Sequence, residues 1–275
     1  MIVELDADSI VYRIGGTVDM LEEGKKFCER LIDTTIQNIY EDTMADEVKV
    51  YLGTNTNFRI QAATMYGYKA NRSDKERPQF YDAIRAYLVH FYGAVLVKDQ
   101  EAEDEVGIQA YKYKDFNEFI IGAIDKDMRM IVGYHYNYIK RKIEFIDKYQ
   151  AIRNFYVQMV TGDMTDNIPG LYHHLLIDNE EEKAKKFKYS RYKSKLIKAL
   201  AEMDEEVSMY KHVLSIYEEQ GQLDKHGLSR ILEISALLWI RRSENQVWVP
   251  PTERDFNYID NDTRERAEND RLETE

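Results

Sequence analysis

Cysteine is nearly absent from this 275-residue sequence, which contains only Cys28. One cysteine cannot form an intramolecular disulfide, so a disulfide-stapled scaffold is excluded. Cys28 stands in the helix-like run at 22–40, where a buried apolar role is expected. These features suit a reducing compartment, and we expect a cytoplasmic protein.

Long apolar runs are also missing. No stretch approaches the length needed to cross a membrane, and the opening residues MIVELDAD carry acids too early for a secretion signal. We therefore expect no membrane partner. With 44% hydrophobic and 32% charged residues and no internal repeat, the composition is that of a globular protein. The length allows one large domain, or one domain with an appendage.

Positive charge is scarce overall, since 38 Lys and Arg face 50 Asp and Glu for a net charge of −12. This average argues against a nucleic-acid partner, because phosphate contacts need local positive charge. The basic residues are clustered, however. Residues 183–198, KAKKFKYSRYKSKLIK, contain eight Lys or Arg and no acid, and YKANRSDKERP at 68–78 is a second cationic stretch. A nucleic-acid partner therefore stays possible.

Short apolar runs alternate with segments of helical periodicity in the first part of the chain. MIVEL, VKVYL, AVLVK and EFIIGAI have the pattern of strands, whereas 20–40 and 81–92 have that of helices. The alternation predicts an α/β fold with a mainly parallel sheet. Beyond Pro169 the pattern is helical until Pro250 and Pro251, and an acidic tail follows. We expect domains at 1–160 and 161–250, with a tail at 251–275.

Acidic residues follow three of the expected strands. Because the carboxyl ends of parallel strands share one edge of a sheet, these side chains should converge there. A further pair lies in VTGDMTDNIP, residues 160–169, a segment that would otherwise be an ordinary polar turn. The groups are Asp6 with Asp8, Glu101 with Glu103 and Asp104, Asp125 with Asp127, and Asp163 with Asp166.

Such a cluster needs neutralisation. Two like charges about 4 Å apart repel by roughly 4 kcal/mol at an effective dielectric constant near 20. Neither His nor Cys accompanies the acids, which disfavours zinc, and all-oxygen ligation favours Mg²⁺ or Mn²⁺. Two such ions form a known arrangement for phosphodiester hydrolysis. Taken singly, each acid is more readily explained as a helix cap or a turn residue.

The motifs LDADSIVYR, YKANRSDKERP, QEAEDEVG, AIDKDM and GDMTDNIPGL follow one another between Leu5 and Leu171. In this order and spacing they resemble the phage and bacterial 5′ nucleases, the flap endonuclease and 5′-3′ exonuclease family. The resemblance implies a PIN-like α/β domain and a helical DNA-binding portion that completes the metal site. The compact size and the many tyrosines and lysines suggest a phage source by association, which would place the protein in the host cytoplasm.

The resemblance assigns roles to particular residues. Lys69 and Arg72 match a basic pair on a gateway helix that contacts the scissile phosphate, and Tyr68 could stack on a base or pack in the core. The expected ligands of two divalent ions are Asp6, Glu101, Glu103, Asp104, Asp125, Asp127, Asp163 and Asp166. Expected DNA contacts are Tyr68, Lys69, Arg72, Lys185, Lys186, Lys188, Arg191, Lys193 and Lys195, although a solvated amphipathic helix explains 183–198 equally well.

The chain departs from the family in two places. The family has an aspartate after its second strand, where this chain has Leu52, Gly53 and Thr54. Asp8 or water could substitute for that carboxylate, and Asp8 is the weaker candidate ligand. The glycine-rich helical hairpin that grips duplex DNA in the family is also missing after DNIPG, and 183–198 would replace it.

These features predict a 5′-3′ exonuclease or flap endonuclease that hydrolyses DNA at or near free 5′ ends in replication or primer removal. The expected partners are DNA with 5′ ends or flaps and RNA/DNA primer hybrids, and the expected state is a monomer. Two alternatives remain open: a PIN-like ribonuclease, and a branched-DNA-binding protein that does not cleave.

Overall fold

A six-stranded sheet forms the centre of the molecule. The computed structural model describes residues 1–72, 76–186 and 189–254. The strand order is β3-β2-β1-β4-β5-β6, and every neighbouring pair is parallel except β5 and β6. This confirms the predicted α/β class. The strands are β1 (Ile2–Asp6), β2 (Glu47–Gly53), β3 (Val95–Val97), β4 (Phe119–Gly122), β5 (Gly133–Asn137) and β6 (Lys142–Ile146).

The four strands expected from apolar runs are all present, whereas the β5–β6 hairpin was not predicted. Its strands, GYHYN and KIEFI, contain no long apolar run. β6 is the edge strand of the sheet, and most of its residues are at least partly exposed. An edge strand needs fewer apolar side chains than a central one, so its sequence signal is weak.

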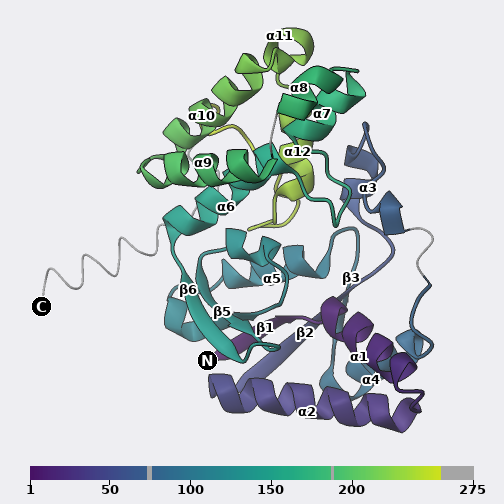
Figure 1. The fold of residues 1–275 in the computed structure, drawn as a ribbon. Coiled ribbons are helices and arrows are strands. Elements are labelled where there is room, and N and C mark those ends of the chain that lie inside the picture. Colours follow the sequence, from purple (N-terminus) through teal and green to yellow (C-terminus); the bar gives the residue numbers. More distant parts are fainter. Residues whose placement is uncertain (73–75, 187–188, 255–275) are drawn as a thin grey trace, which may run out of the picture.

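Helices cover both faces of the sheet (Figure 1). α1 (Asp8–Met20), α2 (Lys25–Thr43) and α4 (Tyr81–Tyr92) share one core with β1 and β2. In α2, Cys28, Ile32, Ile36 and Ile39 recur at helical spacing and are buried. α5 (Ala102–Ala110) packs against the opposite face, and the short helix η2 (Phe116–Glu118) adjoins β4.

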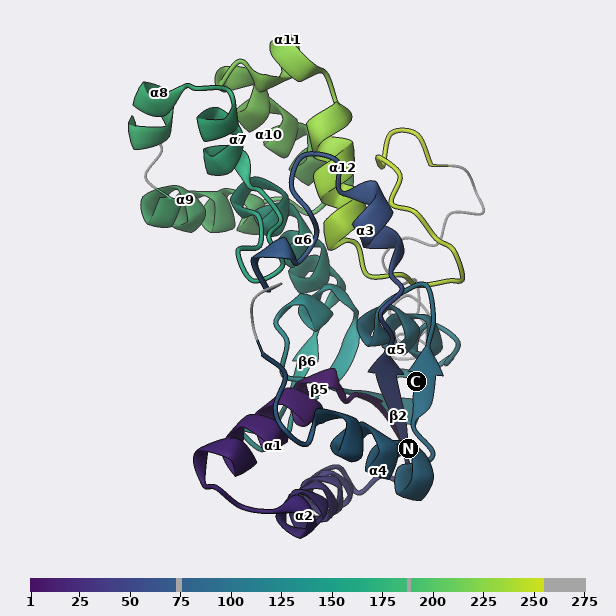
Figure 2. The ribbon, with the colours of Figure 1, turned by 90° about the vertical axis from the view of Figure 1, so that its right-hand side faces the viewer.

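A helical lobe stands over the carboxyl edge of the sheet (Figure 2). One continuous core joins its helices, and α6 contributes several of the largest buried side chains. The short segments α3 (Phe58–Ala62) and η1 (Ala70–Arg72) connect the sheet to this lobe, and η3 (Asp127–Met130) packs against α6. The lobe consists of α6 (Lys148–Thr161), α7 (Leu171–Ile177), α8 (Glu181–Lys186), α9 (Tyr189–Ala201), α10 (Glu206–Glu219), α11 (Gln222–His226) and α12 (Ser229–Leu238).

A buried arginine ties the lobe to the sheet domain. Arg59, in α3, is 2% exposed and donates two hydrogen bonds to Asp104, at 2.5 and 2.9 Å. It also donates to the carbonyl oxygens of Leu237 and Trp239, at 2.8 and 2.7 Å. The guanidinium thus joins α3, α5 and the end of α12. No helix among the described residues is long and apolar enough to span a bilayer.

Loss of the Arg59 guanidinium should leave the Asp104 carboxylate buried and unpaired. We expect Arg59→Met to lower the free energy of unfolding by about 3–5 kcal/mol, measured by urea titration. Arg141→Met is the control, because Arg141 forms a solvent-exposed pair with Asp42. The control should lose much less. Equal losses in the two variants would contradict the structural role of Arg59.

Candidate active site

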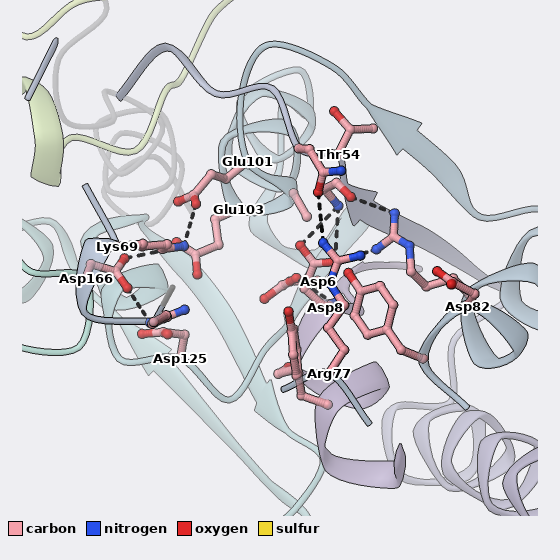
Figure 3. A pocket seen from close by; sticks show the side chains of 18 residues that line it. Asp6, Asp8, Thr54, Lys69, Arg77, Asp82, Glu101, Glu103, Asp125 and Asp166 are labelled. Atoms are coloured by element: carbon pink, nitrogen blue, oxygen red, sulfur yellow. Dashed lines mark hydrogen bonds and ion pairs between the residues drawn. The ribbon is translucent and has the colours of Figure 1, made fainter. Parts of the chain in front are cut away.

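Acidic side chains from five separate segments, including Asp82 of α4, line one pocket of about 580 Å³ at the carboxyl edge of the sheet. Figure 3 shows them around a shared space, with Glu101 and Glu103 opposite Asp125 and Asp166. Asp6 lies at the end of β1, and Asp8 lies beside it. Of the eight expected metal ligands, the pocket brings together Asp6, Glu101, Glu103, Asp125 and Asp166.

The loop after α6 carries Asp166 into this pocket. α6 ends at Thr161 and is capped by Gly162, whose φ of +68° is a conformation that residues with a side chain rarely adopt. A side-chain carbon there would also lie 2.3 Å from the backbone nitrogen of Gly170. Asp163 and Ile168 then exchange backbone hydrogen bonds of 2.9 and 2.7 Å. The glycine and this bridge together give the loop its tight form.

This loop is clamped to the segment that contains Lys69 and Arg72. The Lys69 amide donates to the Asp166 carbonyl oxygen at 2.9 Å, and the Asn71 side chain donates to the Met164 carbonyl oxygen at 2.8 Å. The Asn167 side chain returns a bond of 2.9 Å to Gly67. Two motifs almost a hundred residues apart in sequence are therefore one structural unit.

Lys69 and Arg72 point at the same carboxylate. The Lys69 ammonium lies 2.5 Å from Glu101 and 3.6 Å from Asp166, and Arg72 donates to Asp166 at 2.5 Å. Burial alone would lower the pKa of Lys69, but Glu101 and Asp166 raise it above its usual value. In the described part of the segment expected as a gateway helix, the three residues of η1 are helical, and Lys69 has a φ of +55°. Loop docking, not a shared helical face, aligns the pair.

The remaining acids are short of positive charge. Burial and the neighbouring Asp8 raise the pKa of Asp6 to about 8, although the Asp8 amide donates to its carboxylate at 3.1 Å. Burial and the charge of Asp125 raise the pKa of Glu103 well above its ordinary range. A cation or shared protons would relieve this repulsion. Oxygen-only donors suit Mg²⁺ or Mn²⁺.

Asp127 and Asp163 form a second, separate pair that does not line this pocket. The Lys126 ammonium donates to Asp127 at 3.0 Å and also to Asp163. Burial raises the pKa of Asp127 to about 7, with Asp125 adding to the effect. Within the described ranges, no three His, Cys, Asp or Glu side chains are arranged to hold one metal ion. Metal binding would therefore require carboxylates to turn toward the ion and away from the lysines.

Two residues expected in the site have other partners in this structure. Asp104 is fully buried and is taken up by Arg59 and by the Arg241 amide, at 3.1 Å. The Tyr68 ring lies in the core of the helical lobe, so a base cannot stack on it in this conformation. Its hydroxyl donates to Glu101 and Asp166, at 2.8 and 2.9 Å. Core packing, the alternative interpretation of Tyr68, is what the structure contains.

The Asp8 carboxylate lies against the 52–54 segment, which has no acid of its own. This carboxylate accepts the Gly53 amide at 3.0 Å and lies 3.2 Å from Arg85. A side-chain carbon at position 53 would come within 2.7 Å of that carboxylate, so the glycine makes room for it. Arg85 was not a sequence candidate, because its place in α4 marks it only as an exposed-face cation. In the sequence, the only indication of this contact is an acid at position 8 together with a glycine at position 53.

The lysine-rich stretch divides between two helices. Lys185 and Lys186 of α8 face solvent and pair with Glu181 and Glu182 at 3.6 and 2.7 Å. Lys195 of α9 is exposed, and Lys193 lines a second pocket. Lys188 and the Arg191 side chain lie outside the described residues.

The raised carboxyl pKa values predict a pH dependence of stability. A carboxyl whose folded pKa exceeds its unfolded value near 3.8 contributes stability that is complete below about pH 4 and is lost as pH rises through the folded value. For Asp6 and Asp127 that window reaches about pH 7–8. In EDTA, the free energy of unfolding from urea titrations should therefore fall from about pH 5 to about pH 8.

The matched variant for this pH experiment is Asp6→Asn, which removes one of the carboxyls with a raised pKa. The free energy of unfolding of this variant should depend less on pH than that of the wild type. Added Mg²⁺ should recover part of the lost stability near pH 8, because a bound cation replaces the missing protons. A wild-type stability that does not change with pH would contradict the assigned electrostatics.

Comparison with known proteins agrees with this architecture. The sequence matches no family model and no curated protein sequence. The structure is similar to a complex of the bacteriophage T5 flap endonuclease pseudo-enzyme with product DNA and metal ions. The TM-score is 0.52 at 14% sequence identity, covering 86% of this chain and 88% of that chain. A bacteriophage T5 protein co-crystallised with metal ions gives 0.46 at 16% identity, covering 85% and 98%. By the first of these similarities, the chain has the fold of a 5′ nuclease.

Proposed function

We propose that the protein is a divalent-metal-dependent 5′ nuclease that hydrolyses DNA phosphodiesters at or near free 5′ ends. The observation that carries the proposal is the pocket in which five of the expected metal ligands, and Asp8 and Asp82 as well, meet Lys69 and Arg72. Carboxylates alone would be a cation site, and cations alone would be an anion site. Both together suit a phosphodiester that must be bound and cut in the presence of divalent ions.

The oxygen-only donors fit Mg²⁺ or Mn²⁺. Asp6, Glu101, Glu103 and Asp125 would hold one ion, and Asp127 with Asp163 would contribute to a second after release of Lys126. The chemistry that bound ions supply here is activation of a water nucleophile and stabilisation of the leaving oxygen. The similarity to a metal-containing flap endonuclease complex supports this assignment.

The chain's own residues would position the scissile phosphate. Lys69 and Arg72 are partly exposed at the pocket, with 29% and 37% of their side chains accessible. On substrate entry, the Lys69 ammonium would exchange Glu101 for a phosphate oxygen and free that carboxylate. Arg72 can bind phosphate oxygens through two parallel N–H groups. Tyr68 would keep Glu101 and Asp166 oriented through its hydroxyl.

The division of labour follows the sequence boundaries that we propose. Residues 1–160 would carry most of the chemistry, and 161–250 would add Asp163 and Asp166 and contact duplex DNA. The tail from 251 onward lies almost wholly outside the described residues. Substrates would be DNA with 5′ ends or flaps, including RNA/DNA primer hybrids, and the process would be replication or primer removal by a monomer.

Cleavage of an end-labelled duplex with a 5′ single-stranded tail tests the proposal. Product should form in Mg²⁺ or Mn²⁺ and not in Ca²⁺ or EDTA. An RNA strand of the same sequence separates this activity from that of a ribonuclease. Tight binding of the tailed duplex without product in either metal would instead support a non-cleaving branched-DNA binder.

Neutralising two of the acids should abolish cleavage without unfolding the protein. We expect Asp125→Asn with Asp127→Asn to remove detectable product, because a ligand set is lost. Metal-free stability should be unchanged or higher, because like-charge repulsion is relieved. Cleavage gels and thermal melting measure the two effects. Full activity in the double variant would exclude both carboxylates as ligands.

Lys69 should act on the reaction more than on binding. We expect Lys69→Ala to slow single-turnover cleavage by roughly a hundredfold, because a charge aimed at the phosphate is removed. Affinity measured in Ca²⁺ should change far less. Lys25→Ala on α2 is the charge-matched control and should leave both quantities unaltered. An unchanged cleavage rate for Lys69→Ala would move the phosphate contact elsewhere.

A further inference from the structure

A second pocket of about 530 Å³ lies between η3, α6 and α9, on the far side of the 163–166 loop from the acidic pocket. We call it the basic groove. Four cations, Lys126, Arg129, Arg153 and Lys193, line it together with one carboxylate, Asp163. This local excess of positive charge contrasts with the net charge of −12 of the whole chain.

The four cations are not equally engaged. Lys126 is held by Asp127 and Asp163, and Arg129 pairs with Glu144. Among the described residues, neither Arg153 nor Lys193 forms an ion pair. The Nε atom of Arg153 is buried and has no hydrogen-bond partner in that same set. A buried N–H group without a partner costs about 1–3 kcal/mol, so the Arg153 side chain gains by turning toward an acceptor in the groove.

The other lining residues suit a ligand with both polar and apolar parts. Gln150 and Asn154 line the groove beside Arg153, and the Asn154 amide donates to the Arg129 carbonyl oxygen at 2.9 Å. Met164 and Ile197 present exposed apolar surface, with 62% and 40% of each residue accessible. A nucleic-acid backbone offers this combination, since charged phosphates alternate with sugars.

The groove is adjacent to the candidate active site. Asp163 lines the basic groove, and Asp166, three residues later, lines the acidic pocket. A chain that leaves the acidic pocket across this loop would therefore reach the groove. Figure 1 shows α6 and α9 next to each other, above the sheet edge that carries the acids.

We propose that the basic groove binds the phosphodiester backbone of the DNA substrate away from the scissile bond, through Arg153 and Lys193. This inference rests on the proposed function, because it extends the substrate path of the same site. Arg153 supplies a fork of N–H donors for phosphate oxygens, and Lys193 supplies a mobile point charge. The contacts are to backbone, so they add affinity and register without sequence preference.

The test is the binding of a fluorescent 5′-tailed duplex in EDTA, where cleavage cannot occur, followed by anisotropy at several salt concentrations. Arg153→Ala with Lys193→Ala should weaken binding about tenfold at 0.15 M salt. The slope of log affinity against log salt should become shallower by about 1.8, since each lost phosphate contact contributes about 0.9. Arg153→Lys with Lys193→Arg keeps both charges and should retain most of the slope.

Lys25→Ala with Lys26→Ala is the matched control, because it removes two charges from α2, at the opposite end of the molecule (Figure 1). This variant should bind like the wild type, and thermal melting should show that all variants are folded. An Arg153/Lys193 double variant that is folded and binds DNA with unchanged affinity and slope would overturn the proposal.

The outcomes separate this inference from the proposed nuclease activity. Groove-dependent DNA binding in a protein that cuts nothing would support the groove and refute the nuclease. Cleavage by a protein whose DNA binding does not depend on Arg153 and Lys193 would support the nuclease and refute the groove. Wild-type protein that binds no DNA would overturn both. If the double variant keeps DNA affinity and loses binding to poly-glutamate, the groove is a site for an acidic protein partner and the proposal is wrong.

Discussion

Repulsion among carboxylates at one edge of the sheet is the constraint on which the rest of this structure depends. Parallel strands bring Asp6 and the acids after β4 to the same edge, and α5 adds Glu101 and Glu103. Burial makes each charge costly, which is why the pKa of Asp6 is raised to about 8. Lys69, Lys126 and Arg59 each neutralise part of the cluster. Arg59 forms a buried ion pair with Asp104, Lys69 binds Glu101 in the open acidic pocket, and Lys126 bridges Asp127 and Asp163.

The three groups of acids differ in how their carboxylates are held. Asp104 is committed to Arg59 and holds α3 and α12 against α5, so its charge serves the fold. The carboxylates around Lys69 are held by the partly exposed Lys69 and Arg72 side chains and by the Tyr68 hydroxyl. The Lys126 bridge closes the Asp127–Asp163 pair and faces the basic groove. The acidic pocket and the basic groove are thus bordered by one loop, whose tight form depends on Gly162 and the Asp163–Ile168 bridge.

Much of the architecture could be predicted because its signals are local. Buried central strands need apolar runs, α2 and α4 need apolar residues at helical spacing, and acids after strands must meet at one edge. β6 escaped prediction because an edge strand buries few side chains, and β5 because its sequence, GYHYN, contains no apolar run. Tyr68 and Asp104 were assigned to the site from motif position. Whether a side chain faces a pocket or a core depends on partners such as Arg59 and the helical lobe, which are remote in sequence.

The sequence by itself determined the α/β class, the set of candidate acids and the resemblance to 5′ nucleases. These follow from the residue types and their order, since strand, helix and turn preferences act over a few residues. Only the tertiary structure decided which acids share a pocket, which are neutralised by lysine or arginine, and that Asp8 occupies the space left by Gly53. Electrostatic partnership requires distances of a few ångströms between groups that can be a hundred residues apart. Packing creates that proximity. In this protein the 66–72 segment docks on the 163–167 segment, which brings Lys69 and Arg72 to Asp166.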